Sequence, residues 1–190
     1  MKILGILGSP RLNGNSADLL EAALAGARSA GAETERINLS HMRINPCMEC
    51  RGCDLTSQCI RKEDEMTVIY SKIREVDGIA LSSPIFFMGV TAQTKAMIDR
   101  CQSYWVERFV LKHRPYEGRR RPRGAFLSCA GGRKNTAFEP ALHEAKAFFS
   151  AIDYEYVGEV LLVHTDDSEL PDRKNEALAS ARLLGRRLCE

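Results

Sequence analysis

The sequence predicts an α/β fold in which a doubly wound, five-stranded parallel sheet lies between two layers of helices (αβα). Short apolar runs alternate with amphipathic segments along the chain, as they do in βαβ units. Several apolar runs end in glycine, serine or proline, which suits buried parallel strands that give way to loops. With 190 residues, 44% of them hydrophobic, the chain is expected to form one domain over 1–190.

The first half of the chain supplies two strands and two helices. Residues 2–9 are a short apolar run that stops at a Gly-Ser-Pro turn, and 33–39 are a more polar strand suited to a sheet edge. Residues 15–30 carry leucine and alanine at helical spacing and stop at a glycine. A cysteine-rich insertion at about 45–62 follows, and a helix is predicted at 63–76.

The second half repeats the alternation. Residues 78–84 are a third apolar strand, 91–101 a helix, and 124–132 a fourth strand that runs into a glycine loop. Residues 136–152 are amphipathic, with Pro140 expected in the first turns. A fifth strand and a closing helix are predicted at 157–164 and 174–188. Five such strands favour the order 2-1-3-4-5, which predicts a crevice at the carboxyl ends of the first, third and fourth.

The first loop at that edge is GSPRLNGNS, residues 8–16, and it suits a phosphate group. It leads into the N-terminus of a helix, where free backbone N–H groups and the positive helix end attract anions. A forked cation, two hydroxyls and two amides are available, from Arg11, Ser9, Ser16, Asn13 and Asn15. A helix cap formed by Asn15 or Ser16 is the alternative.

The other two loops predict a planar ring beside the phosphate. The second is unusually apolar and consists of Pro84, Ile85, Phe86, Phe87, Met88 and Gly89. The third is small-sided and consists of Ser128, Cys129, Ala130, Gly131 and Gly132. A phosphate site, an apolar wall and a glycine loop together describe a mononucleotide with a flat ring, and FMN fits best. Alternatively, Phe86 and Phe87 are buried against a helix or another subunit.

Four cysteines lie close together in the insertion with the spacing C-x2-C-x2-C-x5-C, at Cys47, Cys50, Cys53 and Cys59. Such a compact run is closer to iron–sulfur ligation than to zinc sites, which draw ligand pairs from distant segments. Metal-free thiols and zinc remain alternatives. The remaining cysteines, Cys101, Cys129 and Cys189, are expected to be packing residues, with the loop of Cys129 near the ring.

Two stretches resemble the NADPH-dependent FMN reductase family of the flavodoxin-like superfamily. GSPRLNGNS resembles its G-S-P-R-x-x-G-N-[ST] phosphate loop, and SSPIFFMGVTAQTKAMIDR (82–100) resembles its S-P-[VI]-Y-F-G-S-V-[TS]-A-Q-x-K-x-[FM]-I-D-R stretch. The resemblance implies a flavodoxin-like fold and FMN, with the phosphate on the first loop and the ring against the other two. Two departures are Phe86 in place of tyrosine and Met88 in place of glycine.

The cysteine segment resembles that of the iron–sulfur flavoproteins, which carry a [4Fe–4S] cluster beside FMN and transfer electrons. This resemblance implies Cys47, Cys50, Cys53 and Cys59 as cluster ligands and no catalytic acid or base. One alternative is an NAD(P)H-dependent FMN or quinone reductase whose cysteines bind no cluster. Another is a redox-sensing or zinc-binding module.

Composition limits the partners that we expect. A net charge of +2 gives no reason to expect nucleic acid, and no apolar run approaches the roughly 20 residues of a membrane span. The early break at Gly8 argues against a signal peptide, so the protein is expected to be cytoplasmic. The resemblance to these flavoproteins implies a homodimer or homotetramer and a redox partner such as ferredoxin or NAD(P)H. The arginine-rich stretch 118–124 precedes a strand and is expected at the opposite, amino edge.

Overall fold

The computed structural model describes residues 1–132, 135–166 and 170–190, apart from the side chains of Asn135 and Pro171. Its centre is a sheet of five parallel strands in the order β2-β1-β3-β4-β5, which confirms the predicted order. The strands are β1 (Lys2–Leu7), β2 (Glu33–Asn38), β3 (Gly78–Pro84), β4 (Arg123–Cys129) and β5 (Glu155–Leu162).

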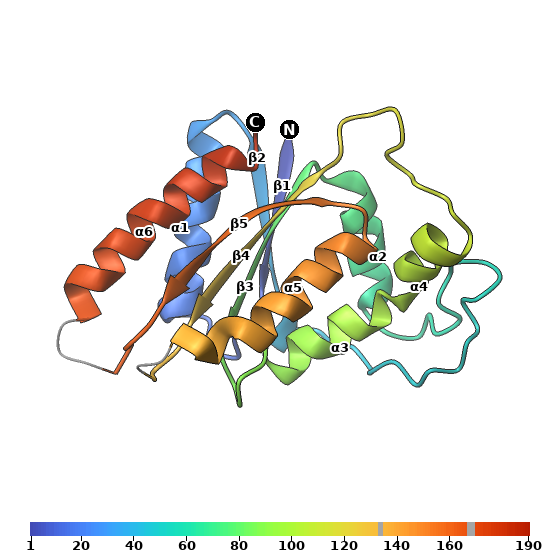
Figure 1. Cartoon of the computed structure of the whole chain (residues 1–190), viewed down its shortest axis with the longest axis horizontal. Coiled ribbons are helices and arrows are strands. Elements are labelled where there is room, and N and C mark those ends of the chain that lie inside the picture. Colours follow the sequence, from blue (N-terminus) through green and yellow to red (C-terminus); the bar gives the residue numbers. More distant parts are fainter. Residues whose placement is uncertain (133–134, 167–169) are drawn as a thin grey trace.

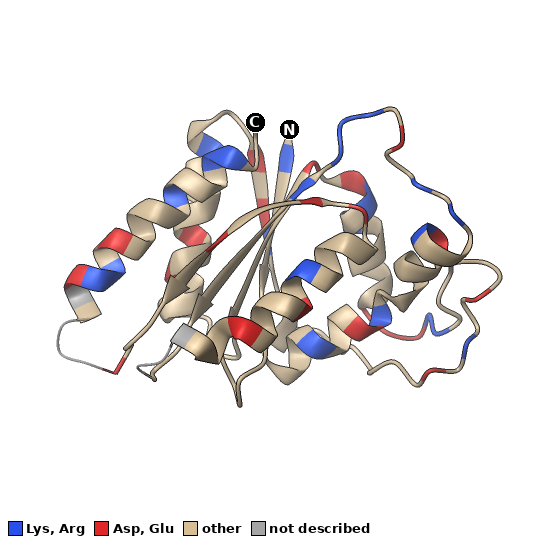
Figure 2. Ribbon diagram, viewed as in Figure 1, with Lys and Arg blue, Asp and Glu red and all other residues tan. Residues whose placement is uncertain are grey.

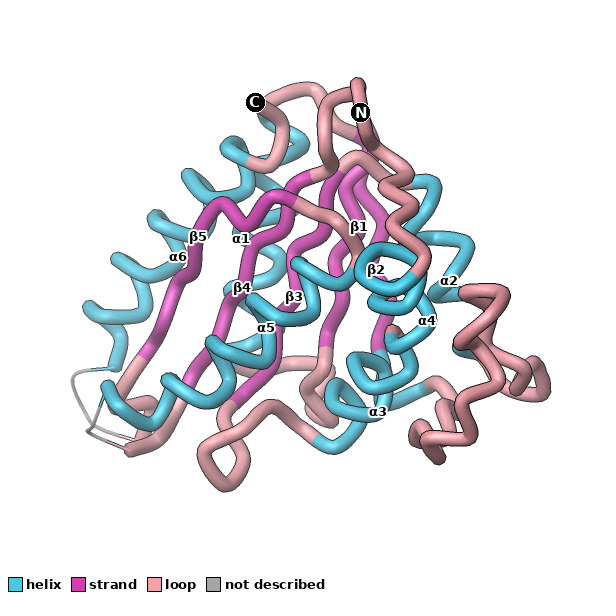
Figure 3. Tube along the Cα trace, turned by 45° about the vertical axis from the view of Figure 1, so that its right-hand side comes forward, coloured by secondary structure: helices cyan, strands magenta, loops and turns pink. Residues whose placement is uncertain are grey.

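Helices cover both faces of the sheet (Figures 1 and 3). One face carries α1 (Asn15–Ser29) and α6 (Leu170–Arg187), whose leucines and alanines form one hydrophobic core with the strands. The other face carries α2 (Met66–Glu75), α3 (Ala92–Arg100), α4 (Gln102–Trp105) and α5 (Glu139–Ala151) over a second core. The predicted three-layer αβα arrangement is confirmed.

Several local features differ from the predictions; for example, α6 begins at Leu170 rather than 174, and β5 begins at Glu155 rather than 157. Helix α2 begins at Met66 rather than 63, because the Met66 N–H donates to the Asp64 carboxylate, 3.2 Å away, which ends the loop there. A 3₁₀ turn precedes α5, which carries Pro140 in its first turn as predicted. After α3, neither α4 nor the turn of π-helix at Val106–Val110 was predicted.

The strand register brings the three predicted loops to one edge. Leu7 pairs with Ser82, and Pro84 pairs with Cys129, so the loops after β1, β3 and β4 leave the sheet side by side. The Gly8 N–H extends the pairing by donating to the Ser82 carbonyl, 2.7 Å away. The arginine-rich loop enters β4 at Arg123 and lies at the opposite edge, as expected.

Charges of both signs are interspersed over the surface, and α5 and α6 each carry acidic and basic residues (Figure 2). This mixture agrees with the small net charge of +2. Within the described ranges, no helix combines the length and the apolar character that crossing a membrane requires.

Helices α1 and α6 approach each other through two glycines. A Cβ atom added at Gly26 would lie 2.0 Å from the Arg182 carbonyl oxygen, and one at Gly185 would lie 1.9 Å from that of Ala23. Because the obstacles are backbone atoms, the helices must separate to admit a methyl group. We predict that Gly26→Ala lowers the free energy of unfolding by about 1–3 kcal/mol, as overpacking does. Urea denaturation measures this.

The matched control is Gly132→Ala, because a Cβ atom there would meet no atom within 4 Å. Equal stability of Gly26→Ala and the unchanged protein would contradict the close helix contact.

Candidate cofactor site and cysteine pocket

The N-terminus of α1 lies open at the carboxyl edge of the sheet. Gly14 occupies the N-cap position, and no described side chain caps the helix, so the capping alternative for Asn15 and Ser16 is wrong. The Asp18 N–H makes the first helical bond, to the Gly14 carbonyl at 2.9 Å. The N–H groups before it have no carbonyl to bond within the helix. They are available to an anion, and the positive end of the helix favours one.

This helix end borders a cavity of about 280 Å³ that the three loops share. Its lining brings together most of the residues predicted to bind the cofactor: Ser9, Arg11, Asn15, Ser16, Pro84, Ile85, Phe86, Cys129, Ala130 and Gly131, with Pro10, Gly14 and Thr165. The other predicted residues, Asn13, Phe87, Met88, Gly89, Ser128 and Gly132, lie outside this lining. Sequence reasoning missed Thr165, which follows the last strand.

The second loop folds back on itself in a tight turn. Phe86 and Gly89 exchange two backbone hydrogen bonds of 3.0 Å, and the residues between them are left-handed, with φ of 48° at Phe87 and 69° at Met88. Neither is glycine, so the turn carries backbone strain. The Phe87 side chain is fully exposed and Phe86 is half exposed, so within this chain neither packs into a neighbouring helix.

Thr91, which caps α3, connects the first two loops. Its hydroxyl donates to the Gly8 carbonyl at 2.6 Å, and its N–H donates to the Ser83 hydroxyl at 3.1 Å. Thr91 and Thr94 are fully buried, and a Cβ atom at Gly8 would lie 1.9 Å from the Thr94 hydroxyl. The start of the phosphate-loop candidate is therefore fixed against the start of α3.

A buried thiol lies in the lining of the cavity. The Cys129 sulfur is 3.1 Å from the Ser16 hydroxyl, and both residues are buried. Burial raises the pKa of the Cys129 thiol, and the contact with Ser16 opposes that rise only in part. A protonated thiol that donates to Ser16 leaves the serine O–H free to donate to a ligand in the cavity.

The third loop is held close to the end of β5. The Ala130 N–H donates to the Leu162 carbonyl at 2.9 Å, and the Thr165 N–H donates to the Ala130 carbonyl at 3.2 Å. A Cβ atom at Gly131 would lie 2.2 Å from the Asp166 carboxylate, so the backbone of this loop lies close to the Asp166 side chain. An uncapped helix end, a cation from Arg11 and a close glycine loop fit a phosphate-bearing ligand.

The cysteine-rich segment leaves the sheet after β2 and forms an irregular loop beside α3 and α4 (Figure 3). Cys47 and Cys50 are exposed, and Cys53 and Cys59 are half-buried. All four line one open pocket of about 870 Å³, together with Arg100 and Trp105. Among the described residues, no three cysteine, histidine, aspartate or glutamate side chains already form a metal-ligand group. The thiols therefore share a pocket without being gathered to one point.

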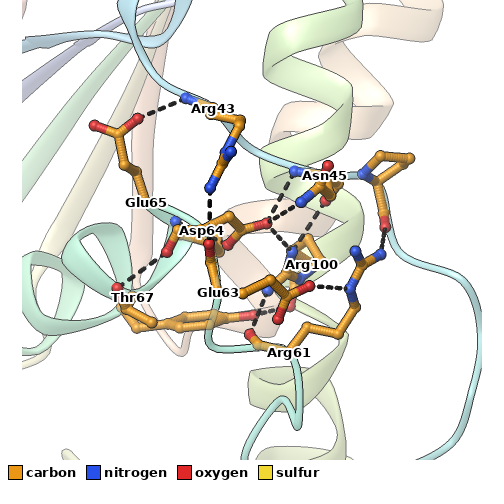
Figure 4. Close-up of polar contacts among 11 residues, drawn as sticks. Arg43, Asn45, Arg61, Glu63, Asp64, Glu65, Thr67 and Arg100 are labelled. Atoms are coloured by element: carbon orange, nitrogen blue, oxygen red, sulfur yellow. Dashed lines mark hydrogen bonds and ion pairs between the residues drawn. The ribbon is translucent and has the colours of Figure 1, made fainter.

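The base of this loop is built on a buried ion pair (Figure 4). Arg100, the last residue of α3, donates to Asp64 at 2.7 Å, and their side chains are 1% and 0% exposed. Burial by itself raises the pKa of the Asp64 carboxyl, but bonds from Arg100 and from the Asn45 N–H outweigh it, so the pKa lies below its usual value. Sequence reasoning missed this pair, although Arg100 ends the second family-like stretch.

Comparison with known proteins agrees with this geometry. Residues 1–166 match the family described as NADPH-dependent FMN reductase. The chain is 39% identical to an iron-sulfur flavoprotein of Archaeoglobus fulgidus over 55% of this chain and 47% of that protein. It is 34% identical to one of Methanocaldococcus jannaschii over 78% of this chain and 71% of that protein. The NAD(P)H:quinone oxidoreductase from Methanothermobacter marburgensis superposes with a TM-score of 0.70 at 19% identity, covering 100% and 98% of the chains.

The sheet order and this structural likeness make the chain a flavodoxin-like α/β protein. Within that class, it belongs to the NADPH-dependent FMN reductase family. The matched stretch spans about half the length of the Archaeoglobus relative.

The left-handed backbone at Met88 allows a prediction about the stability of variants at this position. Glycine adopts a φ of 69° freely, whereas alanine suffers the same backbone penalty as methionine. We predict that Met88→Gly is more stable than Met88→Ala by about 1 kcal/mol in urea denaturation. Both variants lose the methionine side chain, so their difference isolates the backbone. A more stable alanine variant would show that the turn is not strained.

The buried thiols Cys101 and Cys129 predict a loss of stability at alkaline pH. Burial raises the pKa of both thiols, so the folded chain keeps protons that the unfolded chain releases above about pH 8.5. Each thiol then lowers the free energy of unfolding by up to about 1.4 kcal/mol per pH unit. Urea denaturation at pH 7.5 and at pH 9.5, roughly two pH units apart, should show that the free energy of unfolding is lower at the higher pH. If the double variant Cys101→Ala, Cys129→Ala showed the same pH dependence of the free energy of unfolding, the buried thiols would not be its cause.

Proposed function

We propose that this protein is an FMN-dependent oxidoreductase that carries a [4Fe–4S] cluster on its cysteine loop and passes electrons between cluster and flavin. One observation carries the proposal: α3 connects the two sites. Its first turn holds the loop after β1 through Thr91, and its last residue, Arg100, holds the cysteine loop. Nine residues of helix span only about 14 Å. The family and the iron-sulfur flavoprotein relatives support both cofactors.

The residues around the 280 Å³ cavity would bind and orient FMN, which supplies the redox chemistry when bound. Arg11 offers a forked cation to the phosphate, while Ser9, Asn13, Asn15 and Ser16 offer hydroxyl and amide groups. The ring would rest against Pro84–Gly89 and Ser128–Gly132. The exposed phenyl groups of Phe86 and Phe87 would exclude water from one side of the ring.

The cysteine loop suits an iron–sulfur cluster by its donor set. Cys47, Cys50, Cys53 and Cys59 give four thiols on one pocket, and thiolates are the usual ligands of such clusters. The loop has to contract locally to bring them together. Apolar side chains such as Leu55, Ile60 and Trp105 stand around the pocket and would shield the site from solvent.

The second candidate is an NAD(P)H-dependent FMN or quinone reductase that holds no cluster. It is favoured by the family description and by thiols that are not gathered as ligands in the described residues. In that case a nicotinamide donor would approach the ring past the exposed turn at Phe87.

The proposed function also implies other subunits, an electron donor or acceptor, and a cellular compartment. We propose a homodimer or homotetramer, in which exposed apolar groups such as Phe87, Trp105 and Val110 would be covered. A redox partner such as ferredoxin or NAD(P)H would supply or accept electrons. The cytoplasm is the compartment proposed, because cluster thiolates need reducing surroundings.

The phosphate assignment predicts a specific loss on removing Arg11. Arg11→Ala should weaken FMN binding by roughly tenfold to a hundredfold, the worth of charge-assisted hydrogen bonds, and leave riboflavin binding within about twofold. Fluorescence titration with both flavins measures this. Arg119→Ala, at the opposite edge, should change neither. Equal losses for FMN and riboflavin would place Arg11 away from the phosphate.

The ligand assignment predicts that Cys50→Ala lowers the iron content after anaerobic reconstitution while FMN binding stays within about twofold, because the two pockets are lined by different residues. Cys189→Ala is the control, since Cys189 lies outside the loop near the C-terminus. Full iron content in Cys50→Ala would refute the ligand assignment.

A further inference from the structure

We infer that Arg100 is the positioning residue of the cysteine loop: its one guanidinium group joins the two ends of the loop and thereby sets where the four thiols can meet. The effect of Arg100 on iron binding rests on the proposed function. Its effect on the conformation of the loop does not, and that effect can be measured on the metal-free chain.

Arg100 bonds to both ends of the loop at once (Figure 4). One terminal nitrogen, Nη1, donates to the Asn45 carbonyl at 3.0 Å, two residues before Cys47. The other, Nη2, donates to the Arg61 carbonyl at 2.8 Å, two residues after Cys59. The fixed fork of the guanidinium therefore determines the spacing between the points where the loop begins and ends.

Asp64 holds the guanidinium in place and adds its own bonds to the base. Its Oδ2 accepts from Arg100 Nη1 at 2.7 Å, from the Asn45 N–H at 2.9 Å and from the Asn45 side-chain amide at 3.2 Å. Its Oδ1 accepts from the Met66 N–H at 3.2 Å. On the other side, the Tyr70 hydroxyl donates to the Arg100 carbonyl at 2.7 Å. The Arg100–Asp64 pair is costly to break, because either partner alone is a buried charge.

The middle of the loop, residues 47–59, is bonded to itself rather than to the rest of the described residues. Within the described part of the chain, the hydrogen bonds of residues 47–59 join residues of that same stretch, such as Ser57 N–H to the Cys53 carbonyl at 2.8 Å. Leu55 is 89% exposed and Ile60 is 62% exposed. Fixed ends and a self-contained middle mean that the thiols can gather by local folding of the loop. Because the Arg100 bonds already hold the two ends of the loop together, gathering the thiols does not add the entropic cost of closing the loop.

Arg100 also places a positive charge at the pocket. It lines the same 870 Å³ pocket as the four cysteines. A cation beside thiolate ligands favours the more negative, reduced form of a bound cluster. Loss of that charge should therefore make the cluster harder to reduce, an effect that a purely structural support would not have.

Hydrogen exchange on the metal-free chain tests the positioning role without iron. In Arg100→Met, the amides of Asn45 and Met66, which bond to Asp64, should exchange at least roughly tenfold faster than in the unchanged protein. Arg100→Lys keeps a charge for Asp64 but cannot bridge both carbonyls, so it should give an intermediate rate and serves if Arg100→Met does not fold.

The control is Asp153→Asn, which removes another buried carboxylate paired with arginines, Arg114 and Arg121, away from the loop. It should leave the Asn45 and Met66 amides unchanged. Wild-type exchange rates in the Arg100 variants, or equal acceleration in Asp153→Asn, would overturn the inference.

The second measurement uses anaerobically reconstituted protein. Iron loss to a chelator should be at least roughly tenfold faster in Arg100→Met and Arg100→Lys, with FMN affinity within about twofold. The cluster's midpoint potential should move to more negative values in Arg100→Met and less in Arg100→Lys. Unchanged iron retention or an unchanged potential in Arg100→Met would overturn the positioning role. If the unchanged protein binds no iron, the cluster proposal fails, and hydrogen exchange alone decides the role of Arg100.

Discussion

The buried ion pair between Arg100 and Asp64 is the interaction on which the arrangement of both sites depends. It joins the end of α3 to the two ends of the cysteine loop. The start of the same helix is bonded through Thr91 to Gly8, where the phosphate-loop candidate begins. A short, rigid helix therefore sets the separation of the two pockets, and neither can move far without disturbing the other.

Much of the fold could be predicted because it depends on local patterns. Alternating apolar runs and amphipathic segments gave the element order, and the parallel register then brought the loops after β1, β3 and β4 to one edge. The ion pair was missed because Asp64 and Arg100 lie 36 positions apart, and no periodicity marks a buried charge. Thr165 was missed because its place depends on how the chain leaves β5. The spacing of the four cysteines predicted cluster ligands, which stays a prediction, but it could not predict how open the loop would be.

The two pockets differ in how much of their final geometry is already present. The side of the cavity formed by the loop after β1 is tightly held: Gly8 leaves no room for a side chain, and Thr91 and Ser16 are buried. The turn at Phe87 and Met88 keeps a strained backbone and exposed side chains in place. The cysteine loop is fixed only at its base. This contrast suits a nucleotide that enters a preformed cavity and a metal centre that organises its own ligands.

In the function that we propose, one chain holds both a flavin and an iron–sulfur cluster. Anaerobic purification followed by flavin, iron and sulfide assays on the same sample tests it most directly. We expect about one FMN with roughly four irons and four sulfides per chain. FMN without iron would leave a flavin reductase and contradict the cluster, and protein that takes up no FMN would contradict both cofactor assignments.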